Sequence, residues 1–428
     1  MIKQHLRQAW TMMKQHKFFT GVYLIGTAVS ITLAMTLFII FYIKLGNIYP
    51  EENRDRMVVI SDIYHEKDEN GGHISGNTSA SLNMIEQIKS DAKHIDNLAY
   101  CLRRSFHTRT EVNVDGKYFG NYETPAFINS GFWKVFNYRF LSGRAFTEKE
   151  EHENVVVLSR SYAMKLFADT AIVGRTISLK NTPYRIMGVI EDAPLFMTET
   201  NGDLFLPIGC SIVEKYKEGY MDGVHTIYMT APTAAERDML KKEIEDIVNR
   251  MAQNLPSTEK CKVSVWEHWR LGLMYREDGN FFEAISRYLY ILLAFLFIPA
   301  LNLSGAISSR MNSRMTEVGV RKAYGATDKQ IIMQVLWENL LLTFIGAIMG
   351  LIMSYVVVYT CSSWIITFFD PYIVTEPTAK DINTDMLMNP TVLLSTLLLT
   401  LVLNVASALV PTVIALKKDI VQSLYQRR

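Results

Sequence analysis

Residues 310–338, RMNSRMTEVGVRKAYGATDKQIIMQVLWE, decide the fold because they form a charged stretch between two long apolar segments. Ahead of Glu338 the stretch has a local charge excess of +3. A loop of that sign between two membrane spans is typical of the cytoplasmic side. The basic residues are Arg310, Arg314, Arg321, Lys322 and Lys329, and the acidic ones are Glu317 and Asp328.

A helix, a glycine corner and a second helix are predicted within this stretch. Met311, Met315 and Val318 recur at helical spacing, which indicates a short amphipathic helix continuing out of the preceding apolar segment. We expect Gly325 to end it. Next, Thr327 and Gln330 form a capping-box pattern that begins a second helix, with Asp328 in its first turn, where the helix dipole favours a negative charge. The pattern predicts a protruding elbow on which a soluble partner can push.

The order and spacing of the residues in this stretch also match a known signature. Residues 317–326 read EVGVRKAYGA, Gln330 and Ile331 follow, and then Glu338 with Leu340–Leu342. This run resembles the FtsX/MacB-type ABC transporter permeases. The resemblance implies a coupling elbow that docks on a separate ATP-hydrolysing subunit; the alternative is a solvated basic loop. The implied coupling residues are Arg314, Glu317, Val318, Gly319, Arg321, Lys322, Tyr324 and Gly325.

Composition indicates a chain that is partly embedded in a membrane. Hydrophobic residues make up 49% of the 428 residues, and the mean hydropathy is above zero. Residues 1–17 contain four basic residues and no acid, and residues 417–428 contain four basic residues against Asp419. Both ends are therefore predicted to be cytoplasmic. Residues 1–17 are expected to form an amphipathic helix along the inner leaflet, or else an ordinary basic flank.

Residues 18–43 contain no charge and are long enough for a first transmembrane helix. No small-residue cleavage site follows them, so we expect the helix to be retained rather than removed as a signal peptide. Residues 44–285 are polar enough for a mixed α/β extracytoplasmic domain. Strands are expected at 57–61, 111–114, 154–158, 176–179, 184–190, 225–230 and 262–266, helices at 82–90, 159–168 and 233–254, and hairpin turns at Asp115-Gly116 and Asn181-Thr182. Thr233 and Glu236 form a second capping-box pattern.

Part of this domain also resembles the FtsX/MacB-type family. Residues 132–136 (FWKVF), 141–146 (LSGRAF), 155–159 (VVVLS) and 184–190 (YRIMGVI) succeed one another as in the periplasmic core domain of MacB-type permeases. The likeness is greatest over residues 127–192. We expect the divergent parts on either side to carry the choice of substrate or partner.

Three further transmembrane helices are predicted, giving four in total. They cover residues 286–309, 335–360 and 390–416, separated by the elbow at 310–334 and an extracytoplasmic loop at 361–389, with a cytoplasmic tail at 417–428. Pro299 is predicted either to weaken the second helix as a hinge or to be tolerated there without a mechanical role. Pro411, Ala415, Lys418, Asp419 and Leu424 resemble the family's closing pattern, with Ile420 where proline is usual.

Two features of the third span call for a structural interpretation. Gly346, Gly350 and Ser354 form a row of small residues at intervals of four, which favours close packing on another transmembrane helix unless the row is only compositional. Glu338 lies near the cytoplasmic end of the span and is predicted to tie the elbow to the helix bundle; the alternatives are snorkelling or pairing with a basic residue of the elbow.

No catalytic or metal-binding pattern is present in the sequence. It contains no GxxxxGK[ST] phosphate loop, no HExxH and no GxSxG, and its nine histidines are scattered. We therefore expect no cofactor or metal in this chain, no nucleic-acid partner and no enzyme activity, with ATP and Mg²⁺ bound by a partner ATPase. Cys101, Cys210, Cys261 and Cys361 follow no metal-type spacing and are interpreted as packing residues, with a disulfide as the alternative.

The leading hypothesis is an ABC transporter permease in a bacterial inner (plasma) membrane, acting as a homodimer or with a related permease. The spans carry no charge at mid-depth, which favours mechanotransmission to the outer domain over a substrate tunnel. The resemblance implies efflux or extraction on the outer side, with lipids, a periplasmic adaptor or an outer-membrane channel as further partners. The rival is a non-transporting FtsX-like scaffold that activates a cell-wall hydrolase; a membrane-tethered enzyme is a third hypothesis without a catalytic constellation.

Overall fold

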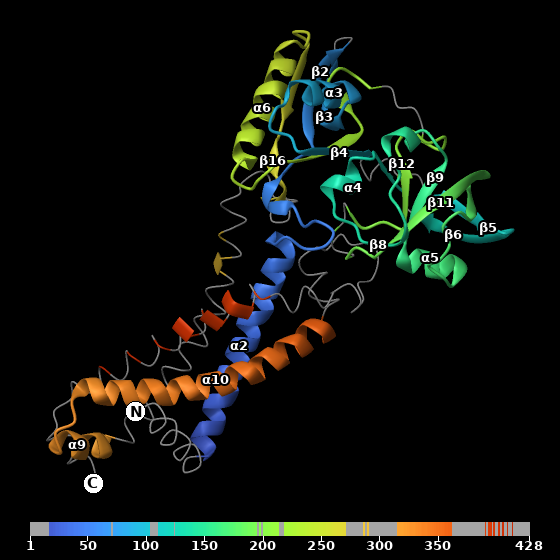
Figure 1. Cartoon of the computed structure of the whole chain (residues 1–428). Coiled ribbons are helices and arrows are strands. Elements are labelled where there is room, and N and C mark those ends of the chain that lie inside the picture. The colour runs from blue at the N-terminus through green and yellow to red at the C-terminus, as the bar shows by residue number, and fades with distance from the viewer. Residues whose placement is uncertain are drawn as a thin grey trace. The chain divides into compact units, whose positions relative to one another are not determined.

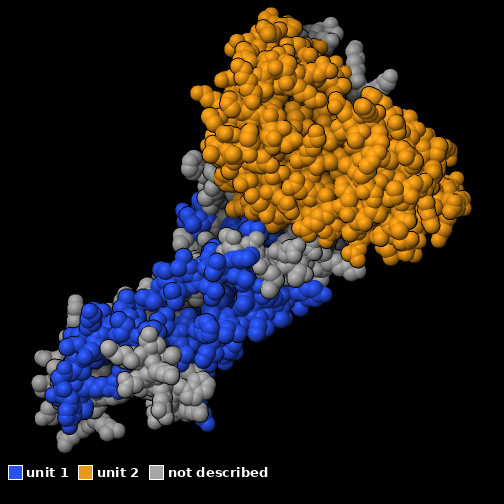
Figure 2. Space-filling model, in the orientation of Figure 1, with its two compact units in different colours: residues 1–43, 277–428 blue, residues 44–276 orange. Residues whose placement is uncertain are grey.

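The structure is a computed structural model, which divides the chain into two compact units (Figure 2). The α/β unit is Lys44–Arg276, and the helical unit comprises residues 1–43 and 277–428. The described residues are 17–69, 72–102, 110–123, 125–194, 197, 200–213, 218–270, 286, 289–290, 315–361, 390, 393–395, 397–398, 401–402, 405, 409 and 413.

The α/β unit is built on one mixed sheet whose described strands number sixteen. Its main path runs β15-β2-β3-β14-β4-β7-β12-β9-β11-β10-β5-β6, with β1, β13, β16 and β8 attached beside it. The strands are β1 (Met57–Ile60), β2 (Ile63–Glu69), β3 (Gly72–Ala80), β4 (Asn97–Leu102), β5 (Thr110–Val114), β6 (Lys117–Glu123), β7 (Ala126–Ile128), β8 (Phe140–Gly143), β9 (Val155–Ser159), β10 (Thr176–Leu179), β11 (Thr182–Ile190), β12 (Leu204–Pro207), β13 (Asp222–Gly223), β14 (His225–Thr230), β15 (Glu259–Val263) and β16 (Trp266–Glu267).

Helices cover the two ends of this sheet (Figure 1). Near one end lie α3 and α6, beside β2, β3 and β16; near the other lies α5, beside β9 and β11. Side chains of successive strand residues point to opposite faces, so Val58 and Ile60 of β1 pack with α3 and α6 while Met57 and Val59 pack against α4. The helices are η1 (Arg54–Arg56), α3 (Leu82–Asp91), α4 (Phe132–Val135), η3 (Glu148–Glu150), α5 (Arg160–Phe167) and α6 (Arg237–Gln253).

Most of the strands and helices expected in this unit are confirmed within a few residues. β14 spans His225–Thr230 as predicted, and Asp115 and Gly116 both have positive φ in the turn between β5 and β6, as a type I′ turn requires. The expected strand at 262–266 is wrong, because the chain changes partner there: β15 pairs with β2 and β16 with β1.

Two local predictions are corrected. The turn between β10 and β11 is Lys180-Asn181 and not Asn181-Thr182, because Thr182 already pairs with Leu179. The capping box at Thr233 and Glu236 is absent, and α6 begins at Arg237 without a side-chain cap. The N–H of Ala231 still bonds to the carbonyl of Arg56 as the chain leaves β14, and a separate turn precedes the helix.

The helical unit contains α2 (Lys17–Leu45), α9 (Met315–Ala323) and α10 (Asp328–Thr360) among its described residues. Over the described part of the chain, α2 and α10 are the helices long and apolar enough to cross a membrane. Most of the amphipathic helix expected at 1–17, of the loop at 361–389 and of the spans at 286–309 and 390–416 lies outside the described residues, as do the tail at 417–428 and Pro299.

Candidate functional site

The candidate functional site is the corner between α9 and α10, where a glycine ends the first helix. Gly325 has a φ of +89°, a conformation that glycine adopts without strain. The N–H of Ala326 bonds to the carbonyl of Arg321 at 3.0 Å, and the N–H of Gly325 bonds to that of Lys322 at 3.0 Å. These two bonds make a Schellman motif, which satisfies carbonyls that the helix end would otherwise leave open. The predicted glycine corner is confirmed.

The second helix begins with the predicted capping box. The side chain of Thr327 accepts a hydrogen bond from the N–H of Gln330, and the Gln330 side chain accepts one from the N–H of Thr327 at 3.0 Å. Asp328 stands in the first turn, where its charge is favourable. The corner is thus fixed on both sides by local hydrogen bonds, so α9 and α10 meet at a defined angle.

Two basic residues of α9 brace this corner. The Nζ of Lys322 lies 2.6 Å from Oδ1 of Asp328, and the side chain of Lys322 is largely buried. The guanidinium of Arg321 donates to the side-chain oxygen of Gln334 on α10. Both cations therefore hold the two helices together, and Gln334 is a bracing residue that sequence patterns did not single out.

The corner exposes apolar and aromatic side chains beside the polar residues 327–330. Tyr324 is 89% exposed, Val320 is 44% exposed and Met333 is 44% exposed, whereas Gly319 is buried. A tyrosine ring on a rigid support is suited to an interface, because it offers a large contact area at little conformational cost. Val320 and Met333 were not recognised from the sequence, since exposure of a single apolar residue has no periodic signal.

Some predicted site residues have no described side chain. Arg314 lies outside the described residues, and Glu317, Val318 and Glu338 belong to described helices although their side chains are not described. The coupling role of Glu317 and the proposed tie through Glu338 remain predictions.

The predicted row of small residues lies on the face of α10 that contacts α2. A Cβ added to Gly346 would lie 2.7 Å from Cγ2 of Thr27, and one added to Gly350 would lie 2.7 Å from Cβ of Ile31. The hydroxyl of Thr32 donates to the carbonyl of Gly350 at 3.2 Å. Ser354 continues the row as a buried residue. The two helices approach so closely at the glycines that no larger residue fits without a shift.

The described residues contain no group of three or more His, Cys, Asp or Glu arranged to hold a metal ion. Cys101 and Cys210 are buried, Cys261 is half-buried, Cys361 is exposed, and all four have free thiols. The candidate site comprises the corner between α9 and α10 and the close packing of α10 on α2.

Comparison with protein families gives two matches that together span most of the chain. Residues 20–247 match the MacB-like periplasmic core domain, and residues 289–420 match the FtsX-like permease C-terminal region. The first match begins within α2 and ends within α6, and the second begins at residue 289, ahead of the elbow.

Similar curated proteins include exporters and a permease. The chain is 22% identical over 237 residues to the macrolide export ATP-binding/permease protein MacB of Pasteurella multocida, covering 53% of this chain and 34% of that one. It is 23% identical over 231 residues to the uncharacterized ABC transporter permease YknZ of Bacillus subtilis, covering 53% and 55%. It is 22% identical to the pyoverdine export ATP-binding/permease protein PvdT of Pseudomonas savastanoi, covering 56% and 36%. The matches span about a third to a half of these relatives.

Similar solved structures are of isolated domains. The periplasmic region of MacB from Actinobacillus actinomycetemcomitans matches with a TM-score of 0.33 and 16% identity, over 49% of this chain and 89% of that one. A domain of a putative permease from Porphyromonas gingivalis matches with a TM-score of 0.38 and 14% identity, over 50% and 90%.

Proposed function

Since this chain belongs to the ABC transporter permease family with a MacB-like periplasmic core domain and an FtsX-like C-terminal region, we propose that it is a permease subunit driven by a separate ATPase. The α/β unit is the extracytoplasmic domain of this permease. The MacB and PvdT relatives are each named as a single ATP-binding/permease protein. This sequence, by contrast, has no phosphate loop. ATP and Mg²⁺ are then bound by the partner subunit.

The proposed topology has four membrane spans in a bacterial inner membrane, with both termini and the elbow in the cytoplasm. Support comes from the two apolar helices α2 and α10, from the basic residues around the elbow and from the uncharged segments at 288–309 and 390–416. A second copy or a related permease completes the membrane part.

The observation that carries the proposal is the braced corner between α9 and α10 with Tyr324 at its tip. A docking element must keep its shape when it is pushed, and the Schellman motif, the capping box and the Lys322–Asp328 pair give it that rigidity. The exposed ring of Tyr324 then provides the contact. ATP hydrolysis moves this corner.

The relay from the corner to the α/β unit runs through two helices. α10 is continuous from Asp328 to Thr360, so it moves as a rod. It packs closely on α2 at Gly346 and Gly350, and the chain of α2 leads directly into the α/β unit at Gly46. Movement at the corner thereby rearranges the outer domain, which is mechanotransmission.

Efflux or extraction of compounds on the outer side is the transport process that we propose. The named functions of MacB and PvdT, macrolide export and pyoverdine export, support export over a purely regulatory scaffold. A periplasmic adaptor or an outer-membrane channel completes the path.

The test is ATPase coupling in the assembled complex. The full chain and a candidate ABC ATPase from the same organism are co-purified into lipid nanodiscs, and ATP hydrolysis is compared with that of the ATPase alone. We expect Tyr324→Ala to weaken assembly at least about tenfold, as the loss of an interfacial aromatic anchor does. Glu317→Ala and Arg321→Ala are expected to abolish the increase in ATP hydrolysis that the full chain causes.

The matched control is Tyr359→Ala. It also removes a tyrosine side chain, near the far end of α10 and roughly 45 Å from the start of that helix at 1.5 Å per residue, and coupling is expected to stay at the wild-type level. Full assembly and full stimulation in both Tyr324→Ala and Arg321→Ala would refute the assignment of the elbow.

A further inference from the structure

A buried ionic cluster lies where the chain enters the α/β unit and where it leaves. Nε of Arg54 lies 2.7 Å from Oε2 of Glu51, and Nη1 of Arg54 donates to the carbonyl of Gly46 at 3.2 Å. Nε2 of His268 lies 3.5 Å from Oε2 of Glu51. Glu51 is 3% exposed and Arg54 is 5% exposed. The first and last segments of the unit therefore meet at one carboxylate.

At neutral pH this cluster is one ion pair beside a neutral imidazole. Burial, the largest single effect, raises the pKa of the Glu51 carboxyl, but the Arg54 guanidinium, His268 and the Thr200 hydroxyl together outweigh it and keep the pKa below its usual value. Burial also lowers the pKa of His268 to about 4. Because a buried charge that loses its partner is strongly unfavourable, the cluster holds its geometry firmly.

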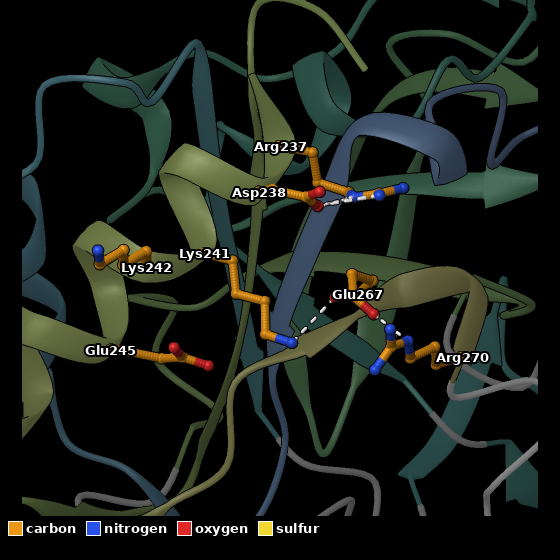
Figure 3. A pocket seen from close by; sticks show the side chains of 7 residues that line it. All are labelled: Arg237, Asp238, Lys241, Lys242, Glu245, Glu267 and Arg270. Atoms are coloured by element: carbon orange, nitrogen blue, oxygen red, sulfur yellow. Dashed lines mark hydrogen bonds and ion pairs between the residues drawn. The ribbon is translucent and has the colours of Figure 1, made fainter. Parts of the chain in front are cut away.

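Glu267, the residue before His268 in the segment by which the chain leaves the α/β unit, contacts β1 and α6 instead. Glu267 lies on β16, which pairs with β1 through Val58. Nζ of Lys241 on α6 lies 2.9 Å from Oε1 of Glu267, and the guanidinium of Arg270 lies against Oε2 (Figure 3). Nη1 of Arg237, also on α6, donates to the carbonyl of Asp55 at 3.0 Å. Helix α6 is thus tied to both the entry and the exit segment.

The cleft that these residues line has four basic and three acidic side chains, and the ion pairs among them leave it poorly suited to an ionic ligand. Lys241 and Arg270 share Glu267, and Arg237 pairs with Asp238 at 2.9 Å (Figure 3). The remaining two lining residues, Lys242 and Glu245, have opposite charges. The arrangement is that of a clasp and not of an anion site.

Glu51 connects the same segments to the middle of the sheet, where β12 lies between β7 and β9. Its Oε1 accepts a hydrogen bond from the hydroxyl of Thr200 at 2.8 Å. The carbonyl of Thr200 accepts a hydrogen bond from Tyr138, whose ring packs against Phe205 of β12 at 5.4 Å between centroids. The chain of contacts from Lys241 to Thr200 therefore joins α6 to the β12 region through the entry and exit segments.

We propose that Glu51, Arg54, Thr200, His268, Glu267 and Lys241 form an entry–exit clasp that positions α6, near one end of the outer sheet, relative to β12 in its middle. The clasp makes the segment after α2 and the segment after β16 one rigid body. A displacement of either segment is passed to α6 and to the β12 region at the same time. Its use in transport rests on the proposed function, but the clasp itself does not.

The test is hydrogen–deuterium exchange of the full chain in lipid nanodiscs without any ATPase. Thr200→Val removes the hydroxyl that holds Glu51. We expect amide exchange in α6, at residues 237–253, to rise about tenfold, because freeing a buried carboxylate oxygen eases local opening by that order. The control is Thr78→Val, which also removes one hydroxyl hydrogen bond, to the carbonyl of Gly223 at 3.1 Å, outside the clasp.

The reciprocal variant is Lys241→Met, for which we expect faster exchange at residues 200–213 and rescue by Lys241→Arg. Coupling between two sites must act in both directions. The proposal is overturned if Thr200→Val changes exchange only at residues 200–213, if every strand of the sheet exchanges faster to the same degree, or if Thr78→Val raises exchange in α6 equally.

The two proposals fail separately in these experiments. A positive exchange result together with normal ATPase coupling in the elbow variants would leave the clasp standing and remove the transport function. If the elbow variants lose ATPase stimulation but Thr200→Val leaves amide exchange in α6 unchanged, the transport function stands and the clasp is refuted.

Discussion

Acidification from pH 7 to pH 5 is predicted to destabilise the α/β unit through His268. This histidine lies against Tyr228, with ring centroids 6.0 Å apart, and beside Glu51 and Arg54. Burial, which excludes the charged form, lowers its pKa from 6.5 to about 4. The unfolded chain therefore takes up a proton at His268 in a pH range where the folded protein does not.

The direction of the effect follows from this difference. The contribution of neutral His268 to the free energy of unfolding is fully present above the unfolded pKa of 6.5. It is lost as the pH falls towards the folded pKa of about 4. Between pH 7 and pH 5 the loss from His268 is about 1.8 kcal/mol. For a domain of this size that corresponds to a fall in the melting temperature of about 4–7 °C. His225, whose pKa burial also lowers, acts in the same direction.

The assay compares melting temperatures of the full chain in detergent at pH 7 and pH 5, followed by near-ultraviolet circular dichroism. His268→Gln cannot be protonated, so its fall between the two pH values should be smaller than that of the wild type by about 4–7 °C. His268→Asn is the second variant, and His152→Gln replaces an exposed histidine as the control. Equal falls in the wild type and both His268 variants would refute the reasoning.

Three further predictions concern close approaches and helix ends, each measured by thermal unfolding of the full chain. Gly350→Val should separate α10 from α2 and destabilise the helical unit by about 1–3 kcal/mol, whereas Met349→Val on the exposed face should have little effect; equal effects would contradict the packing seam. Gly143→Ala should cost more than about 3 kcal/mol, because its Cβ would lie 2.1 Å from a backbone oxygen, whereas Gly116→Ala, in open space at a similar φ, should cost roughly 1–2 kcal/mol. Thr327→Ala should destabilise the start of α10 by about 1 kcal/mol, and a change near zero would show that the capping box does not matter there.

The elbow was predictable because its signals are local. A glycine at a helix end and a Thr–x–x–Gln pattern act within a few residues, and both Gly325 and Thr327 have the predicted roles. The Asp115-Gly116 turn was predictable for the same reason. Thr233 had a similar pattern and failed, because pairing of Ala231 with Arg56 and the turn after it delay the helix.

The ribbon of β2 and β3 had no usable sequence signal. β2 reads IYHEKDE and β3 reads GHISGNTSA, so neither shows a sustained alternation of apolar and polar residues. Their position is set by pairing with each other and with β15, which is a property of the folded unit. An alternating sequence pattern arises where one face of a strand is buried. A ribbon without a buried face lacks this pattern and cannot be predicted from it.

The entry–exit clasp was also invisible in the sequence, since Glu51, Thr200 and His268 are far apart along the chain. Each is a common polar residue in an ordinary context, and only the folded sheet brings them together. Glu51 and Arg54 are three residues apart, which on its own suggests no more than a surface ion pair.

Burial of this ion pair needs an explanation other than stability. An ion pair removed from water gains little net stability over apolar side chains of the same size, because desolvation offsets the attraction. An apolar contact is non-directional, whereas Glu51 places Arg54, Thr200 and His268 at fixed positions around one carboxylate. Directional contacts resist sliding of one segment past another. A joint that must pass displacement from two chain segments to α6 and to the middle of a sheet needs that resistance, and this is the physical reason for an ionic cluster in the proposed clasp.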